Sequence, residues 1–302
     1  MIPSKVVQFF AHRCNARDLL VAEREVVLTY ALHRLHEQGV SPRLAFKGGT
    51  ALRKLVFGSG GRFSEDLDFT LVDGDKDEAA IHLHDALDGK THHGVSFTLS
   101  NFYETDDSFA VMVGYRHDWN EKGQFKFQVS TRESPTLPMP TLQQIDQPYF
   151  SSLEFGAPPA IQALQPIEMI AEKVRATFQR VKVRDAYDLH LYATLDATKG
   201  FDIELVRGLV VLKLWQVRDP FDPGVLFEKL HGGEYDWKEL DPLLPPGKRV
   251  DVKELLQPIM ARFGGLAALN ELDKRVIADS SSGYNVVIAD QLREQVRARH
   301  GR

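Results

Sequence analysis

Apolar residues recur at helical spacing along the segment that follows Asn15 and Asp18. From Leu19 to Leu35 they fall on one face of a helix with 3.6 residues per turn. We predict a long helix that begins at Asn15 or Asp18, because both residue types accept hydrogen bonds from the first free N–H groups of a helix. Gly39 is expected to end it, since glycine readily takes the left-handed conformation that closes a helix.

A two-residue alternation follows and indicates strands. Residues 44–47 are predicted to form a short strand that runs into a turn at Gly48 and Gly49, followed by a helix over 50–56. Residues 66–72 alternate apolar and polar side chains, as a strand with one buried face does. Further strands with the same alternation are predicted over 95–99, 110–116 and 124–130.

The pattern changes after residue 134. Prolines are concentrated in 134–166, and because proline fixes φ and lacks an N–H donor, we expect a connector with little regular structure. Beyond it a helix is predicted with Pro166 in its first turn. The chain therefore predicts an α+β fold, with an α/β domain over 1–150 and a mainly helical domain over 151–302. The further helices expected are 186–196, 202–217, 252–262, 265–277 and 285–299.

The amino-acid composition adds to the predicted fold mainly by excluding several classes of protein. Of 302 residues 43% are hydrophobic and 26% charged, which excludes a disordered or collagen-like chain. The net charge of -5 excludes a histone-like basic coat. The single cysteine, Cys14, can form neither an internal disulfide nor a thiolate metal cluster, so we expect a reducing compartment. No stretch approaches the roughly 18 apolar residues of a membrane span. We expect a soluble, cytoplasmic protein.

The segment Phe46–Phe69, FKGGTALRKLVFGSGGRFSEDLDF, carries the candidate chemistry. A strand ends in Gly48 and Gly49 and a helix starts at once, so free N–H groups face the turn and favour a phosphate. Asp66 and Asp68 lie two positions apart on a strand, on the same face, where paired carboxylates typically coordinate Mg²⁺ together with substrate phosphates. Each feature alone is common in ordinary turns and strands. Together they indicate metal-assisted phosphoryl or nucleotidyl transfer.

This order of features resembles the DNA polymerase β-type nucleotidyltransferase superfamily. FKGGTALRK followed by FSEDLDF is more similar to the AbiEii/AbiGii toxin family, which includes the mycobacterial MenT toxins. IEMIAEKVRAT and VRDAYDLH resemble that family's third and fourth motifs, and LKLWQ its later tail segment. The resemblance spans roughly residues 40–230. It implies a polymerase β-like head with a mixed sheet and flanking helices, followed by a helical C-terminal domain.

The resemblance also implies roles for individual residues. Asp66 and Asp68 fall on the catalytic carboxylates that bind Mg²⁺ or Mn²⁺. Lys173 and Asp185 fall on the catalytic lysine and acid of the third and fourth motifs. A nucleoside triphosphate (NTP) is the implied substrate. Its implied contacts are Lys47, Gly48, Gly49, Thr50, Ser64, Arg175 and Asp188.

Spacing alone leaves the residues of the third and fourth motifs open. Lys173 and Arg180 are seven positions apart and lie on one flank of their helix. Asp185 and Asp188 are three apart and are expected to be neighbours along one side of the next helix. Without the resemblance, Lys173 is an ordinary solvated lysine and Asp185 a helix N-cap. The run 173–184 is rich in basic residues, so an anionic partner is expected there.

One departure concerns the third carboxylate that polymerase β-type enzymes often carry on a later strand. The matching strand is predicted over 124–130, and its polar face carries no acid but Lys126, Gln128 and Ser130. Three interpretations stay open. The third acid is Asp185, or it is Glu133 from beyond the strand, or the metal site has only two protein carboxylates.

Three functions stay open from the sequence. The first is a toxin that transfers a nucleotide from an NTP to an RNA, by resemblance the tRNA 3′ end, and so blocks translation in a toxin–antitoxin or abortive-infection system, with a cognate antitoxin expected. The second is a nucleotidyltransferase acting on a protein or small-molecule hydroxyl. The third is a non-catalytic nucleotide-binding protein.

Histidines are also concentrated in one stretch, IHLHDALDGKTHHG, which contains His82, His84, His92 and His93. The spacing does not give a convincing set of metal ligands, so we predict surface loop and helix there.

Overall fold

The computed structural model describes residues 2–195, 201–247 and 251–301. The chain forms two compact units. The expected division at residue 150 falls inside the irregular proline-rich connector, most of which packs with the first unit. The first unit comprises Met1–Pro135, Met139–Leu164 and Asp241–Lys248, and the second comprises Thr136–Pro138, Gln165–Leu240 and Arg249–Arg302.

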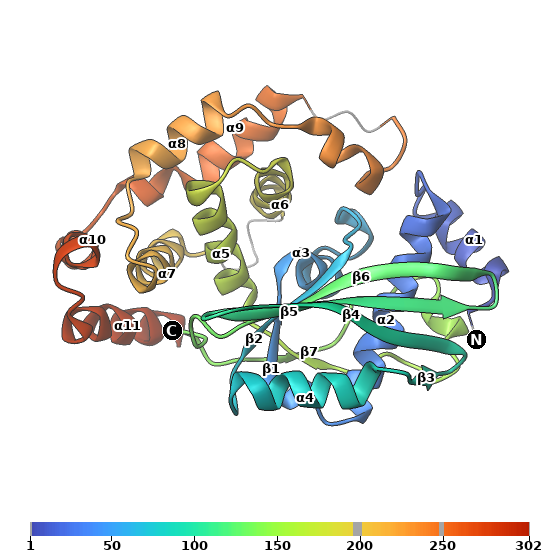
Figure 1. Cartoon of the computed structure of the whole chain (residues 1–302). Helices are drawn as coiled ribbons and strands as arrows, with labels where there is room; N and C mark the ends of the chain where they lie inside the picture. Colours follow the sequence, from blue (N-terminus) through green and yellow to red (C-terminus); the bar gives the residue numbers. More distant parts are fainter. Residues whose placement is uncertain (1, 196–200, 248–250, 302) are drawn as a thin grey trace. The chain divides into compact units, whose positions relative to one another are not determined.

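The first unit contains a mixed six-stranded sheet in the order β1-β2-β6-β5-β4-β3 (Figure 1). Strands β2 and β6 are parallel and the other neighbours are antiparallel. The sheet and its helices confirm the predicted α+β class. Strands β4 to β6 extend beyond the predicted ranges, and a two-stranded sheet is built into the connector. The strands are β1 (Leu44–Lys47), β2 (Asp66–Leu71), β3 (Thr91–His92), β4 (Val95–Thr105), β5 (Ser108–His117), β6 (Asn120–Ser130), β7 (Thr141–Leu142) and β8 (Ile161–Gln162).

Four helices accompany the sheet. Helix α2 begins after Asp18, whose carboxylate accepts from the Leu20 N–H at 2.9 Å, and it is followed by Gly39 at φ +70°. Helix α3 starts at Gly48, earlier than predicted, and continues into one π-helical turn, Arg53–Phe57. Helix α1 was not predicted, although Val7 and Phe10 lie at helical spacing and are buried. The helices are α1 (Ser4–Arg13), α2 (Leu19–Glu37), α3 (Gly48–Leu52) and α4 (Lys76–Leu87).

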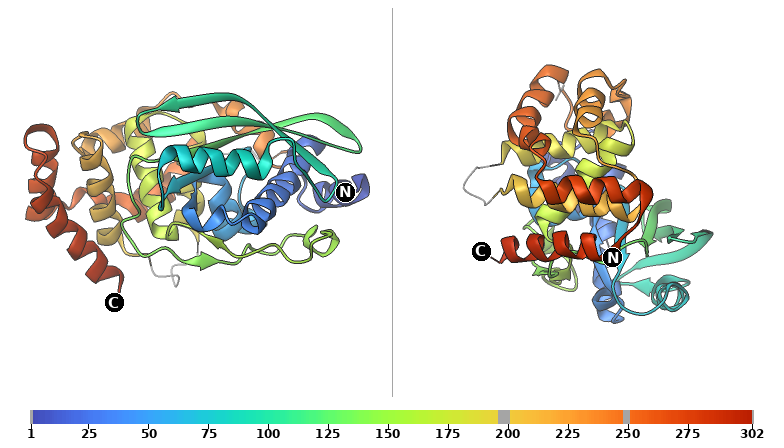
Figure 2. Two further views of the ribbon diagram at one scale, coloured as in Figure 1. Left: turned by 60° about the horizontal axis from the view of Figure 1, so that its bottom comes forward. Right: turned by 90° about the vertical axis from the view of Figure 1, so that its left-hand side faces the viewer.

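Helices α2 and α4 lie against one face of the sheet (Figures 1 and 2). Leu67 and Phe69 of β2 and Phe125, Phe127 and Val129 of β6 point to this face and are buried, whereas Asp66 and Asp68 at alternate positions are partly exposed. The opposite face therefore carries the polar residues of the same strands, including Asp66 and Asp68.

The second unit is helical. Helix α7 is buried almost all round, and α5, α10 and α11 pack against it. The helices predicted here are present over the described residues, although residue 196, the predicted end of one of them, lies outside those residues. Helix α10 begins at Glu271 rather than 265, and α8 was not predicted. The helices are α5 (Pro166–Gln179), α6 (Val183–Thr194), α7 (Ile203–Gln216), α8 (Pro223–Gly232), α9 (Val252–Phe263), α10 (Glu271–Ser282) and α11 (Val286–His300). Among the described residues, none of the helices combines the length and apolar character needed to cross a membrane.

A buried ionic cluster fixes α3 and its π-helical turn against α2. The Glu25 carboxylate accepts from Arg53 Nε at 3.0 Å and from Lys54 Nζ at 2.8 Å, and Lys54 Nζ also donates to Thr29 Oγ1 at 2.8 Å. All three charged side chains are only 1% exposed. Burial alone would raise the pKa of Glu25, but Lys54 and Arg53 hold it below its ordinary value.

We predict that Glu25→Ala lowers the free energy of unfolding by about 3–5 kcal/mol, because it leaves two buried cations without their anion. Urea titration followed by circular dichroism measures the change. Glu78→Ala is the control, because Glu78 pairs with Arg43 at the surface of the same unit and should cost less than about 1 kcal/mol. Equal losses in the two variants would contradict a special role for Glu25.

Candidate active site

The turn between β1 and α3 can be formed only by glycine. Gly48 has a φ of +80°, in the left-handed region. A Cβ atom at Gly48 would lie 2.5 Å from Asp68 Oδ2 and 2.9 Å from Asp68 Cβ, closer than real Cβ atoms approach their neighbours. The Asp68 carboxylate therefore stands directly over the backbone of the turn.

The space around Gly49 also leaves no room for a side chain, because Arg62 and Ser64 occupy it. A Cβ atom there would overlap the Arg62 guanidinium and lie 2.9 Å from Ser64 Oγ. Arg62 and Ser64 are both buried, and Arg62 Nη1 donates to Ser64 Oγ at 3.3 Å. The structure thus brings the expected Ser64 to the turn and adds a cation, Arg62, that the sequence analysis did not select. The signal was available, since Arg62 is the one cation between Leu55 and Ser64.

The residues on either side of the two glycines anchor the turn to β2. Thr50 is buried, and its hydroxyl donates to the carbonyl of Asp66. Lys47 is the register partner of Asp68 across the β1–β2 pair, so both side chains lie on the same sheet face. The structure therefore gathers the expected residues Lys47, Gly48, Gly49, Thr50, Ser64, Asp66 and Asp68 around one turn and one strand.

Strand β6 borders the two aspartates on the other side. Asp66 is the register partner of Lys126 and Asp68 of Gln128, and the Lys126 N–H lies 3.4 Å from Asp66 Oδ1. Lys126 Nζ donates to Gln128 Oε1 at 2.6 Å. The position where related enzymes often carry a third acid thus holds a lysine and an amide here. Two carboxylates fit Mg²⁺ or Mn²⁺, which commonly bind through one or two protein carboxylates and complete their shell with substrate phosphates and water.

A surface groove of about 520 Å³ begins at Lys126 and Gln128 and crosses the sheet face to β4. Tyr103, Ala110, Gln128 and Asp68 follow one another as register partners across four strands. Strands are spaced about 4.8 Å apart, so Tyr103 lies about 14 Å from Asp68 along this row. Tyr103 is 76% exposed, which leaves its ring open to a ligand at the far end of the groove.

The second unit contains the residues expected from the third and fourth motifs. Lys173 Nζ lies 2.8 Å from Asp185 Oδ1 and 3.0 Å from Asp188 Oδ2, and Arg180 Nε lies 2.9 Å from Asp185 Oδ2. The two aspartates are neighbours on α6, as expected from their spacing, and Lys173 contacts both. Both are buried, because this side of α6 packs toward α5. Lys173 is accordingly a paired lysine and not an ordinary solvated one.

Asp185 does not cap its helix. It lies in the first turn of α6, after the N-cap residue Lys182, so the capping interpretation was wrong. Burial would raise the pKa of Asp185, but Lys173 and Arg180 hold it well below its ordinary value. Arg175 Nη2 lies 3.9 Å from Glu172 Oε1, and Glu172 also pairs with Lys213. The structure thus joins Lys173, Asp185 and Asp188 and places Arg175 in a neighbouring ion pair.

Comparisons with known proteins bear on this arrangement. The family profile described as nucleotidyl transferase AbiEii toxin, type IV toxin–antitoxin system, matches residues 30–269. Among solved structures, MenT4, a nucleotidyltransferase toxin from Mycobacterium tuberculosis H37Rv, is similar with a TM-score of 0.81 and 25% sequence identity. The match covers 98% of this chain and 100% of MenT4. No curated protein matches the sequence significantly. The chain belongs to the AbiEii family of nucleotidyl transferase toxins.

Proposed function

We propose that this protein transfers a nucleoside monophosphate from an NTP to the 3′ end of an RNA, with tRNA as the expected acceptor. The observation that carries the proposal is the position of the Asp68 carboxylate directly over the Gly48 backbone, with Asp66 on the same strand face. Phosphate oxygens bound at the glycine turn would therefore lie beside both carboxylates. Such an arrangement suits nucleotidyl transfer, in which positioning and charge neutralisation supply most of the catalysis.

Asp66 and Asp68 would hold Mg²⁺ or Mn²⁺. When bound, the cation withdraws charge from the triphosphate oxygens and lowers the pKa of a coordinated hydroxyl. The chain adds positive charge of its own, because Arg62 packs against Gly49 and Lys47 shares the face of Asp68. In the transfer, the acceptor hydroxyl oxygen bonds to the α-phosphorus, the bond to the β-phosphate oxygen breaks, pyrophosphate leaves, and the hydroxyl proton passes to solvent.

Lys173 and Asp185 enter the proposal through the family resemblance. We propose that Lys173 contacts the triphosphate and that Asp188 and Arg175 support that contact. Because its pKa lies well below the ordinary value, Asp185 stays ionised and is a weak proton acceptor. Its proposed role is therefore to position Lys173 and the acceptor, not to act as the general base.

The groove beside β6 favours a long acceptor over a small one. Single-stranded nucleic acids bind to surfaces that combine aromatic rings for base stacking with cations for the phosphates. Tyr103 supplies an exposed ring and Lys126 a cation at the end near Asp66. We propose that the acceptor strand follows this groove and places its terminal hydroxyl beside the two aspartates.

The family description supports a biological role. AbiEii proteins are described as toxins of type IV toxin–antitoxin systems. A tRNA whose 3′ end carries an added nucleotide no longer has the terminus that accepts an amino acid. We therefore propose that the protein arrests translation in the cytoplasm, in a toxin–antitoxin or abortive-infection system, and that a cognate antitoxin counteracts it.

We predict that Asp66→Asn and Asp68→Asn each reduce transfer at least about 1000-fold, because each removes one negative charge from a site with two carboxylates. The assay incubates each labelled NTP with Mg²⁺, total tRNA and the protein. Asp77→Asn, an exposed carboxylate in the same unit, is the control. Label on tRNA supports the proposal, whereas label on protein, or nucleotide binding without transfer, refutes the RNA acceptor. Activity retained in either variant refutes the metal assignment.

Gly48→Ala is expected to abolish transfer in the same assay, because the methyl group would displace the Asp68 carboxylate and strain the backbone at φ +80°. Gly60→Ala is the matched control, since a Cβ atom there would meet nothing within 4 Å. Circular dichroism checks that both variants are folded. A folded Gly48→Ala protein with full activity would show that the turn does not position Asp68 for catalysis.

Lys173→Ala is expected to raise the KM for NTP about tenfold or more, which corresponds to losing one charge-assisted hydrogen bond. Lys182→Ala, which removes a half-exposed lysine paired with Glu239, should leave KM unchanged. The thermal midpoint, Tm, is measured alongside. A lower Tm with an unchanged KM would assign Lys173 a purely structural role in holding Asp185 and Asp188.

A further inference from the structure

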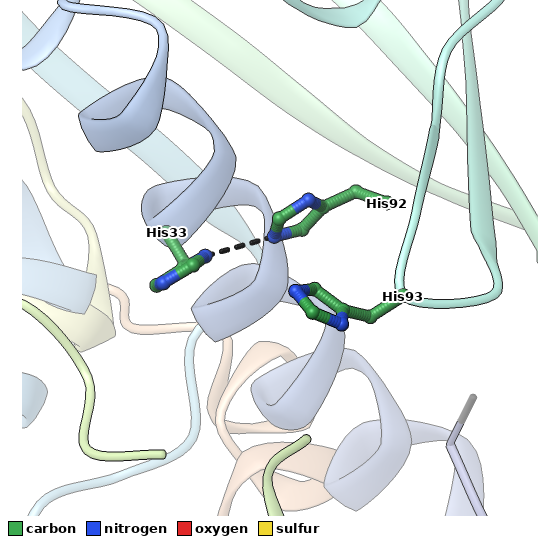
Figure 3. Close-up of side chains that lie close together, drawn as sticks. All are labelled: His33, His92 and His93. Atoms are coloured by element: carbon green, nitrogen blue, oxygen red, sulfur yellow. Dashed lines mark hydrogen bonds between the residues drawn. The ribbon is translucent and has the colours of Figure 1, made fainter. Parts of the chain in front are cut away.

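Three histidines meet on the side of the first unit where α2 passes the β3–β4 hairpin (Figure 3). His33 comes from α2, His92 ends β3, and His93 lies in the hairpin turn. Their potential ligand nitrogens all lie within 4.8 Å of one another. None of the three has a part in the proposed transfer reaction.

The spacing is close to that of a metal site. His33 Nδ1 and His92 Nε2 lie 2.9 Å apart and share a hydrogen bond. Zinc binds imidazole nitrogens at about 2.0–2.1 Å in a tetrahedron, so two such ligands are about 3.3 Å apart. A cation would replace the shared proton, widen this pair by a few tenths of an ångström and draw the third nitrogen inward by rotation about side-chain bonds.

The surroundings orient the rings. The Phe155 ring stacks on His33 with 3.9 Å between centroids. Glu37 Oε2 lies 3.5 Å from His92 Nδ1, which leaves His92 Nε2 facing His33. A carboxylate behind a ligating histidine is the usual second layer of a zinc site.

The hairpin turn supplies an independent observation. His92 pairs with Val95, so His93 and Gly94 form a two-residue loop, with φ values of +45° and +77°. Loops of this kind prefer Asn-Gly, because asparagine adopts the left-handed conformation most readily among residues with a side chain. A histidine held in this conformation, beside two others, suggests that its side chain has a function.

We propose that His33, His92 and His93 bind one divalent transition-metal ion, with Zn²⁺ as the first candidate and water as the fourth ligand. Three imidazoles suit zinc, copper or nickel and do not suit Mg²⁺, so this site is chemically distinct from the Asp66–Asp68 pair. The bound ion cross-links α2 to the β3–β4 hairpin. Two of its ligands come from the hairpin and one from α2.

The test uses the full chain, stripped with chelator and titrated with ZnCl₂ against a chromophoric competitor, and with CoCl₂ followed by visible absorption. His93→Asn is the informative variant, because asparagine suits the turn and should leave the metal-free protein folded. His84→Asn, on the exposed side of α4, is the matched control. We expect one Zn²⁺ per chain in the parent and in His84→Asn, and at least about 100-fold weaker binding in His93→Asn. Zn²⁺ at 100 times Kd should raise the parent Tm by about 5–10 °C and leave His93→Asn unchanged.

Two results would overturn the site. One is equal zinc affinity in the parent and in His93→Asn. The other is no stoichiometric binding by the parent, which would make the cluster a packing arrangement of imidazoles on Phe155. Transfer activity with Mg²⁺ is measured in parallel and is expected to survive in His93→Asn. Loss of that activity in a folded His93→Asn protein would contradict the separation of this site from the transfer reaction.

Discussion

The absence of side chains at Gly48 and Gly49 is the constraint on which the candidate site depends. Asp68 approaches the backbone of one glycine, and Arg62 with Ser64 approaches that of the other. Two aspartates on a strand are ordinary by themselves. They become a candidate phosphate-transfer site because the neighbouring strand ends in a bend that lets a carboxylate and a guanidinium stand against the main chain. Any Cβ atom there would push one of them away.

Buried ion pairs fix the positions of the helices near the proposed catalytic residues. In the first unit, Glu25 binds Arg53 and Lys54 on the segment that continues α3, so the helix that opens at the glycine bend has a fixed position. In the second unit, Lys173 joins α5 to α6 through two buried aspartates. Charges removed from water are tolerated only with partners in good geometry, so such clusters specify one arrangement of the helices. The same arrangement keeps Asp185 ionised and unsuited to accepting a proton.

The two proposed cation sites differ in ligand chemistry, and this separates their roles. Carboxylates on an open sheet face suit a hard cation that arrives with a triphosphate. Imidazoles between α2 and a hairpin suit a resident ion that ties two elements together. The hairpin strand β4 also carries Tyr103 at the far end of the groove. The proposed zinc site and the groove therefore share the β3–β4 hairpin but no side chain.

Local regularity in the sequence determined the fold class, most helices and strands, the glycine bend and the shared face of Asp66 and Asp68, because each depends on residues a few positions apart. The β6 residues beside the aspartates could also be predicted, since strand alternation assigns their face. Tertiary structure alone decided that Arg62 packs on Gly49 and that Lys173 is bound by Asp185 and Asp188. It also brought His33 to His92 and His93, for which the sequence analysis had predicted surface loop and helix. Such contacts join residues distant in the chain, and no periodicity records how two elements pack.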